Sequence, residues 1–94
     1  MKNNRLLSEE LHQLIDSYHS GSSDLAHLSQ RAETLVEAMR PRLPADIFLS
    51  AMNCVYLIEE ISALAMDEDR KITAVESQDI DQHLSILEDL VVVG

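Results

Sequence analysis

The stretch from Ile47 to Met66 constrains the fold of this chain more than any other. It reads IFLSAMNCVYLIEEISALAM, and fifteen of its twenty residues are apolar. A helix that is hydrophobic on nearly every side must be enclosed. The stretch has the length of a membrane span, but Glu59 and Glu60 lie within it. Each acid would cost roughly 2–3 kcal/mol at bilayer depth. We therefore expect the central buried helix of a soluble protein, at about residues 45–66, with no membrane partner.

Apolar residues recur at helical spacing on both sides of that stretch. They predict further helices at about residues 8–19, 23–40 and 74–91. The connections are short, which favours antiparallel neighbours. We expect an all-α fold, either a small four-helix bundle or paired helical hairpins, in a single domain of residues 1–94. The three stripes consist of Leu7, Leu11, Leu14, Ile15 and Tyr18, then Leu25, Leu28, Ala32, Leu35, Val36 and Met39, and finally Ile80, Leu84, Leu87 and Val91.

Local signals set the expected ends of these helices. Ser8 is a suitable N-cap for the first helix, and Gly21 ends it. The serines at 22–23 are candidates to begin the second helix, which Pro41 ends because proline disfavours a helical residue before it. The Thr-x-x-Glu pattern at 73–76 predicts a capping box at the start of the last helix.

The charge is concentrated in the second half of the chain. Residues 1–45 carry six acids and five bases, whereas residues 46–94 carry eleven acids and two bases, and the net charge is −10. Repulsion from phosphates argues against a nucleic-acid partner. The acidic half suits a basic or amphipathic protein partner, although a merely solvated surface is the commoner reason for such a charge. A lone cysteine, Cys54, allows no intrachain disulfide, so we expect a cytoplasmic protein. The N-terminal residues lack a secretory-signal pattern, which agrees with that expectation.

The long apolar helix carries one thin polar line, which Leu57 and Leu64 interrupt. These leucines are seven residues apart, so they share a face, and three neighbouring helices leave that face uncovered. We expect it to contact a second molecule, which predicts a homodimer. On the last helix, Asp81 and Glu88 also share a flank. The residues predicted to bind a partner are Leu57, Glu60, Leu64, Asp67, Glu68, Asp69, Asp81 and Glu88.

No local motif indicates catalysis. The sequence has no glycine-rich phosphate loop, no cysteine cluster and no nucleophile with a base nearby, and only 3% of its residues are aromatic. His19 and His27 each follow an aspartate by three residues, but the apolar stripes contain no carboxylate to complete an inward-facing metal site. We therefore expect a non-enzyme without a metal or cofactor.

Two short segments point to alternative functions. His19-Ser20-Gly21 resembles the phosphorylation site of histidine phosphotransfer domains, which are acidic four-helix bundles, but it lacks their lysine. Residues 67–75, DEDRKITAV, resemble the stretch before the last helix of acyl carrier proteins. That family attaches its cofactor to a serine, and Asp46-Ile47-Phe48 at the matching place has none. These resemblances imply a phosphorelay or carrier protein.

We expect first a small acidic binding module that masks a basic or amphipathic partner, such as a regulator, an inhibitor or immunity-type protein, or a chaperone. The alternatives are a carrier or phosphorelay protein and a purely self-assembling structural module.

Overall fold

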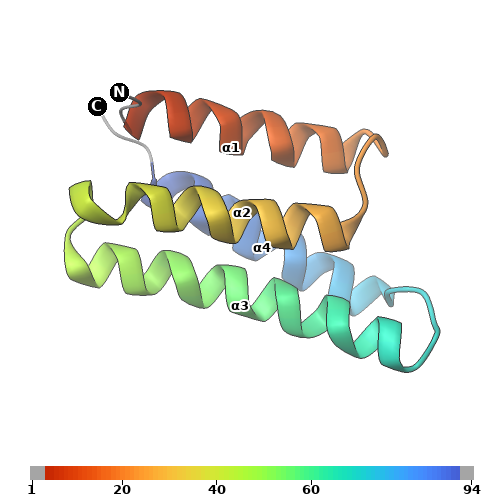
Figure 1. The fold of residues 1–94 in the computed structure, drawn as a ribbon. Helices are drawn as coiled ribbons and strands as arrows, with labels where there is room; N and C mark the ends of the chain where they lie inside the picture. The colour runs from red at the N-terminus through yellow and green to blue at the C-terminus, as the bar shows by residue number, and fades with distance from the viewer. Residues whose placement is uncertain (1–3, 92–94) are drawn as a thin grey trace.

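The computed structural model describes residues 4–91 and confirms the all-α fold. Consecutive helices run in opposite directions and form a small four-helix bundle, in which α4 crosses obliquely behind α2 (Figure 1). Both ends of the described chain therefore lie at the same end of the bundle. The helices are α1 (Asn4–His19), α2 (Leu25–Met39), α3 (Ala45–Asp67) and α4 (Ala74–Leu90), and a short 3₁₀ turn, η1 (Arg40–Arg42), follows α2.

The core is built from the apolar faces of all four helices. Leu11, Leu28, Ile58 and Leu84, one from each helix, are almost completely buried. α3 packs against both α2 and α4, and it also contributes Ala51, Met52, Cys54, Val55 and Ile61 to the core. Because α1 packs mainly on α2, the seam between α1 and α4 is the least extensive contact of adjacent helices around the bundle.

The first helix begins earlier than the sequence predicted. Ser8 was expected to be its N-cap, but α1 already begins at Asn4 and Ser8 is buried inside the helix. The reason is the position of Leu7, four residues before Leu11, which continues the apolar stripe and is itself buried. Since no glycine or proline lies in this segment, nothing ends the helix sooner.

The start of α2 also differs from the expectation. Neither Ser22 nor Ser23 caps it, because Asp24 is the N-cap and its Oδ1 accepts the His27 N–H at 2.8 Å. The Ser22 hydroxyl instead lies 3.1 Å from that of Ser20, within the turn that follows α1. At the other end, α2 stops at Met39.

The long helix α3 is amphipathic in its packing although its sequence is apolar nearly all round. Its inner side is buried, while Leu49, Tyr56, Leu64 and Met66 remain exposed. Among the described residues it is the one helix long and apolar enough, by length and composition, to cross a membrane. The same composition is typical of the core helix of a bundle, and α3 occupies that position here.

Candidate functional site

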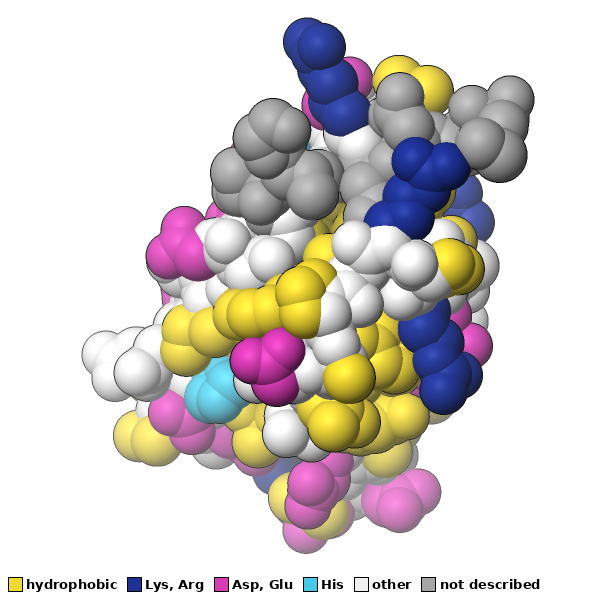
Figure 2. All heavy atoms as spheres, turned by 90° about the vertical axis from the view of Figure 1, so that its left-hand side faces the viewer, with side chains coloured by type: hydrophobic (Ala, Val, Ile, Leu, Met, Phe, Trp, Pro, Cys, Tyr) yellow, Lys and Arg dark blue, Asp and Glu magenta, His cyan; other side chains and the backbone are white. Residues whose placement is uncertain are grey.

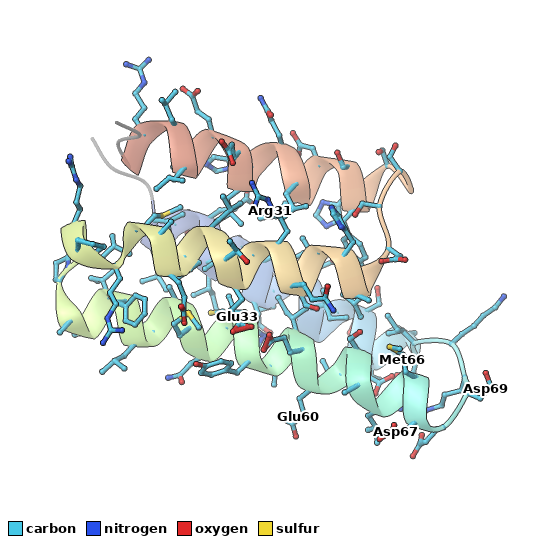
Figure 3. All side chains as sticks on the ribbon, viewed as in Figure 1. Arg31, Glu33, Glu60, Met66, Asp67 and Asp69 are labelled. Atoms are coloured by element: carbon cyan, nitrogen blue, oxygen red, sulfur yellow. The ribbon has the colours of Figure 1, made fainter. Side chains whose placement is uncertain are left out.

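Exposed apolar and acidic side chains occur together where α3 ends and α4 begins. We call this surface the acidic end and define it as Leu64, Met66, Asp67, Asp69 and Val75. The three apolar side chains are 45%, 70% and 68% exposed, respectively. Figure 3 shows Met66, Asp67 and Asp69 at this end of the bundle. Large apolar side chains this exposed are costly in water and are candidates for contact with another molecule, although Leu64 and Met66, two residues apart on α3, lie on opposite sides of that helix.

Glu60 extends this surface along α3. It lies one helical turn before Leu64 and projects away from the bundle (Figure 3). Its side chain is exposed, and within residues 4–91 it has no ion-pair partner. Glu60 therefore adds negative charge beside the apolar part of the acidic end.

The connector between α3 and α4 is fixed by one arginine and a helix cap. Arg70 donates hydrogen bonds to both carboxylate oxygens of Glu76, at 2.8 and 3.0 Å, and also pairs with Glu68. The guanidinium, together with the Thr73 N–H, lowers the pKa of Glu76 to about 2. Thr73 and Glu76 form both halves of the predicted capping box. The turn also needs a left-handed backbone at Asp69, whose φ is 50°.

This arrangement leaves the acidic end with unbalanced charge. Arg70 pairs with both Glu68 and Glu76, so its positive charge is neutralised within the connector and does not offset the other acids of the acidic end. Asp67 and Asp69 are exposed and have no ion pair in the part of the chain that the structure describes. Lys71 is the neighbouring exposed cation. The surface is therefore suited to a positively charged partner.

A cleft of about 400 Å³ adjoins the acidic end, between the start of α2 and the end of α3. Leu25, Ala26, Ala65 and Met66 provide its apolar lining. Asp24, Asp69 and Arg70 contribute polar groups, and Ser62 completes the lining. An apolar side chain with a positively charged neighbour matches this combination of surfaces.

Two predicted binding residues of α4 lie against α1 instead of pointing freely into solvent. Asp81 and Glu88 do share one flank, but Asp81 Oδ1 lies 3.1 Å from His19 Nε2, and Glu88 Oε2 lies 2.5 Å from His12 Nδ1. Both pairs bridge the seam between α1 and α4. Asp81 also acts on Tyr18, whose pKa is raised first by burial and then by this carboxylate.

These two pairs were missed at the level of sequence, although a signal was present. His12 and His19 are seven residues apart, as are Asp81 and Glu88. When two helices are antiparallel, two residues seven apart on one helix can each pair with one of two residues seven apart on the other. His19 is also the last residue of α1, rather than a residue in the middle of a helix.

Leu57 and Leu64 have different surroundings. Leu64 is 45% exposed and belongs to the acidic end. Leu57 is partly buried and packs against the core. The expectation that both contact a second molecule stays a prediction, and Leu64 is the member with most surface to offer.

A pair of carboxyl groups on the α2 side of α3 was also not predicted from the sequence. Glu59 faces Glu33 of α2, and both side chains are partly buried. Burial, a hydrogen bond with Glu33 and repulsion from Glu33 together raise the pKa of Glu59 to about 7. Glu59 faces α2, whereas the next residue, Glu60, is exposed, so two adjacent glutamates of one helix have opposite environments.

The opposite end of the bundle carries a second apolar surface, which we call the η1 patch and define as Arg40, Arg42, Leu43, Phe48 and Leu49. The guanidinium carbon of Arg40 lies 5.1 Å from the centre of the Phe48 ring, and Leu49 is 61% exposed. Figure 2 looks onto this end and shows hydrophobic side chains across its lower half, with Lys and Arg side chains along the upper and right-hand margins.

Comparisons with protein-family models, with curated proteins and with solved structures found no match. Among residues 4–91, no three histidine, cysteine, aspartate or glutamate side chains lie together in a way that would hold a metal ion. The acidic end is therefore the candidate site, on the ground of its exposed apolar surface and unpaired acids.

Proposed function

We propose that this chain is a non-catalytic protein-binding module whose acidic end binds a basic, amphipathic segment of another protein. The partner segment would place apolar side chains against Met66 and the adjoining cleft. Its lysines or arginines would face Asp67, Asp69 and the neighbouring Glu60. Since Cys54 is a free, buried thiol, a reducing compartment such as the cytoplasm suits the protein.

The exposure of Met66 is the observation that carries this proposal. Met66 is 70% exposed, so most of its apolar side chain is in contact with water within the subunit. Its unbranched, polarisable side chain adapts to different apolar surfaces, as methionines at binding surfaces commonly do. The adjoining cleft provides a place for an apolar anchor of the partner beside Met66.

The acids supply the second part of the proposal. Charges around an apolar contact mainly set specificity and the rate of association. Asp67 and Asp69 are exposed and without ion pairs among the described residues, so they lose no internal contact when a cation approaches. A basic partner therefore gains attraction here without breaking the fold.

The proposal is tested by titrating the protein with a synthetic amphipathic helix made of leucine and lysine. Isothermal calorimetry at low salt should give a 1:1 complex, and affinity should fall as salt rises. A peptide with the same leucine positions and glutamate in place of lysine should not bind. Absence of binding by the leucine-lysine peptide at low salt would refute the proposal.

Because the whole chain is acidic, a matched control must separate a site from general attraction. The variant Asp67→Asn with Asp69→Asn removes two charges at the acidic end. The variant Glu37→Gln with Asp89→Asn removes two exposed charges from the other end of the bundle. The first should weaken binding of the basic peptide about tenfold, which corresponds to about 1.4 kcal/mol, and the second should change it little. Equal effects would mean that no localised site exists.

A further inference from the structure

The two ends of the bundle carry complementary surfaces. The η1 patch surrounds a cleft of about 320 Å³, which Arg40, Leu43, Ala45, Phe48 and Leu49 line. Like the acidic end, it combines exposed apolar side chains with charge, but the charge has the opposite sign. The chain thus presents at one end the kind of surface that the proposed function assigns to the partner of its other end.

The arginines of the η1 patch are available to an external carboxylate. Arg40 and Arg42 are exposed, and neither has an ion-pair partner within residues 4–91. The guanidinium carbon of Arg40 lies 5.1 Å from the centre of the Phe48 ring, so a cation–π contact places this charge beside the cleft. Glu37 and Asp46 are the nearest acids in the sequence, and no ion pair joins either one to these arginines.

The two surfaces are too far apart to meet within one molecule. Phe48 and Met66 are eighteen residues apart on the same helix, which corresponds to about 27 Å at 1.5 Å per residue. Figure 1 shows η1 at one end of the bundle and the connector between α3 and α4 at the other. Any contact between them must therefore be made by two copies.

We propose that the η1 patch of one copy binds the acidic end of a second copy, with Met66 entering the cleft beside Phe48 and with Asp67 and Asp69 facing Arg40 and Arg42. This inference rests on the proposed function, because it uses the same acidic end. In an end-to-end arrangement each added copy leaves one free end of each kind, whereas two antiparallel copies would make the contact twice and close a dimer. Short linear assemblies form at high protein concentration.

Such assemblies would regulate partner binding. Each acidic end that is occupied by a neighbouring copy is unavailable to a basic partner, because both use Met66 and the same carboxylates. Self-association and partner binding are therefore mutually exclusive, and a basic amphipathic peptide in excess dissolves the assemblies into 1:1 complexes.

Sedimentation velocity on two complementary variants tests this proposal. The first variant, Arg40→Gln with Arg42→Gln, has a disabled η1 patch and an intact acidic end. The second, Asp67→Asn with Asp69→Asn, has the reverse. Each variant alone should stay monomeric at concentrations where the wild type associates. A mixture should form a 1:1 complex and nothing larger, because each copy offers only one working surface.

Two results would overturn the proposal. They are a wild type that stays monomeric up to millimolar concentration, and a mixture of the two variants that stays monomeric. The variant Glu37→Gln with Asp89→Asn, which changes the net charge as much as the second variant does, should still associate. Loss of association in that control would contradict the proposed contact, since it would assign the effect to net charge.

The failure of this inference is distinguishable from the failure of the proposed function. The Arg40→Gln, Arg42→Gln variant should bind the leucine-lysine peptide with the affinity of the monomeric wild type. If the peptide binds at the acidic end while the wild type never associates, only the contact between copies is wrong. If the peptide does not bind at all, the proposed function is wrong.

Discussion

Replacement of Glu59 by glutamine should stabilise the protein at alkaline pH and not at acidic pH. Glu59 lies against Glu33 across the contact between α2 and α3, and its pKa is raised from 4.5 to about 7. Burial is the largest cause, followed by the hydrogen bond with Glu33 and by the repulsion from its charge. The folded protein therefore binds the proton of Glu59 more tightly than the unfolded chain does.

The sign and size of the effect follow from this difference. A raised pKa in the folded state gives a contribution to stability that is complete below pH 4.5 and is lost as the pH rises through about 7. A shift from 4.5 to about 7 is about 2.5 units, or about 3 kcal/mol at 1.36 kcal/mol per unit. Because both side chains are only partly buried, solvent screening reduces this, and we expect about 1–2 kcal/mol at about pH 8.

Urea unfolding of three proteins at about pH 5 and about pH 8 measures this effect. The wild type should lose stability relative to Glu59→Gln between the two pH values. The control is Glu60→Gln, which changes the adjacent, exposed glutamate and should follow the wild type. Comparison of variants removes the titration of other groups, such as Glu76, whose pKa is lowered to about 2. Parallel pH dependences for wild type and Glu59→Gln would refute the reasoning.

Three further predictions concern the loops and the core. Thr73→Ala removes the hydroxyl that caps α4 and should lower the free energy of unfolding by about 1 kcal/mol in thermal or urea unfolding; an unchanged midpoint would contradict the role of the cap. Gly21 has a φ of 84° and open space around it, so Gly21→Ala should cost about 1 kcal/mol through the backbone alone, whereas Gly21→Asn should cost less. Equal costs for the two substitutions would point to a different cause. Burial raises the pKa of the Cys54 thiol, so it should react with a thiol reagent far more slowly than a free thiol in the unfolded chain, and fast labelling of the native protein would disprove its burial.

The helices were predictable because their signals are local. Each apolar stripe depends on residues three and four positions apart, and the capping box of α4 depends on Thr73 and Glu76 alone. The errors in local structure are at helix starts, where more than one residue can serve as a cap. Asp24, and not Ser22 or Ser23, is the N-cap of α2. Leu7 is buried in the core, so α1 begins before Ser8.

The equal spacings of the histidines on α1 and the acids on α4 allowed the pairs between these helices, but the sequence alone could not decide that they form. Which acids meet which bases depends on how far each helix is rotated about its own axis. Asp81 and Glu88 share a flank, as predicted, but that flank faces α1 and its histidines. In the same way, the rotation of α3 turns Glu59 toward Glu33 and leaves Glu60 in solvent.

The candidate site was partly predictable. Leu64, Asp67 and Asp69 were expected to bind a partner, and the structure places all three at the acidic end. Met66 and Val75 were not among the predicted binding residues, although they are 70% and 68% exposed. The η1 patch was missed entirely, since Arg40 and Phe48 meet only after the chain has turned between α2 and α3.

The location of the bound partner tests the central claim most directly. Backbone amide NMR spectra recorded during titration with the leucine-lysine peptide should show the largest shifts at Leu64, Met66, Asp67, Asp69 and Val75. Smaller shifts should follow at Leu25, across the adjoining cleft. The amides of the η1 patch should stay unchanged once the protein is dilute enough to be monomeric. Shifts spread evenly over all exposed acids, or centred on another surface, would contradict the proposal that the acidic end is the binding site.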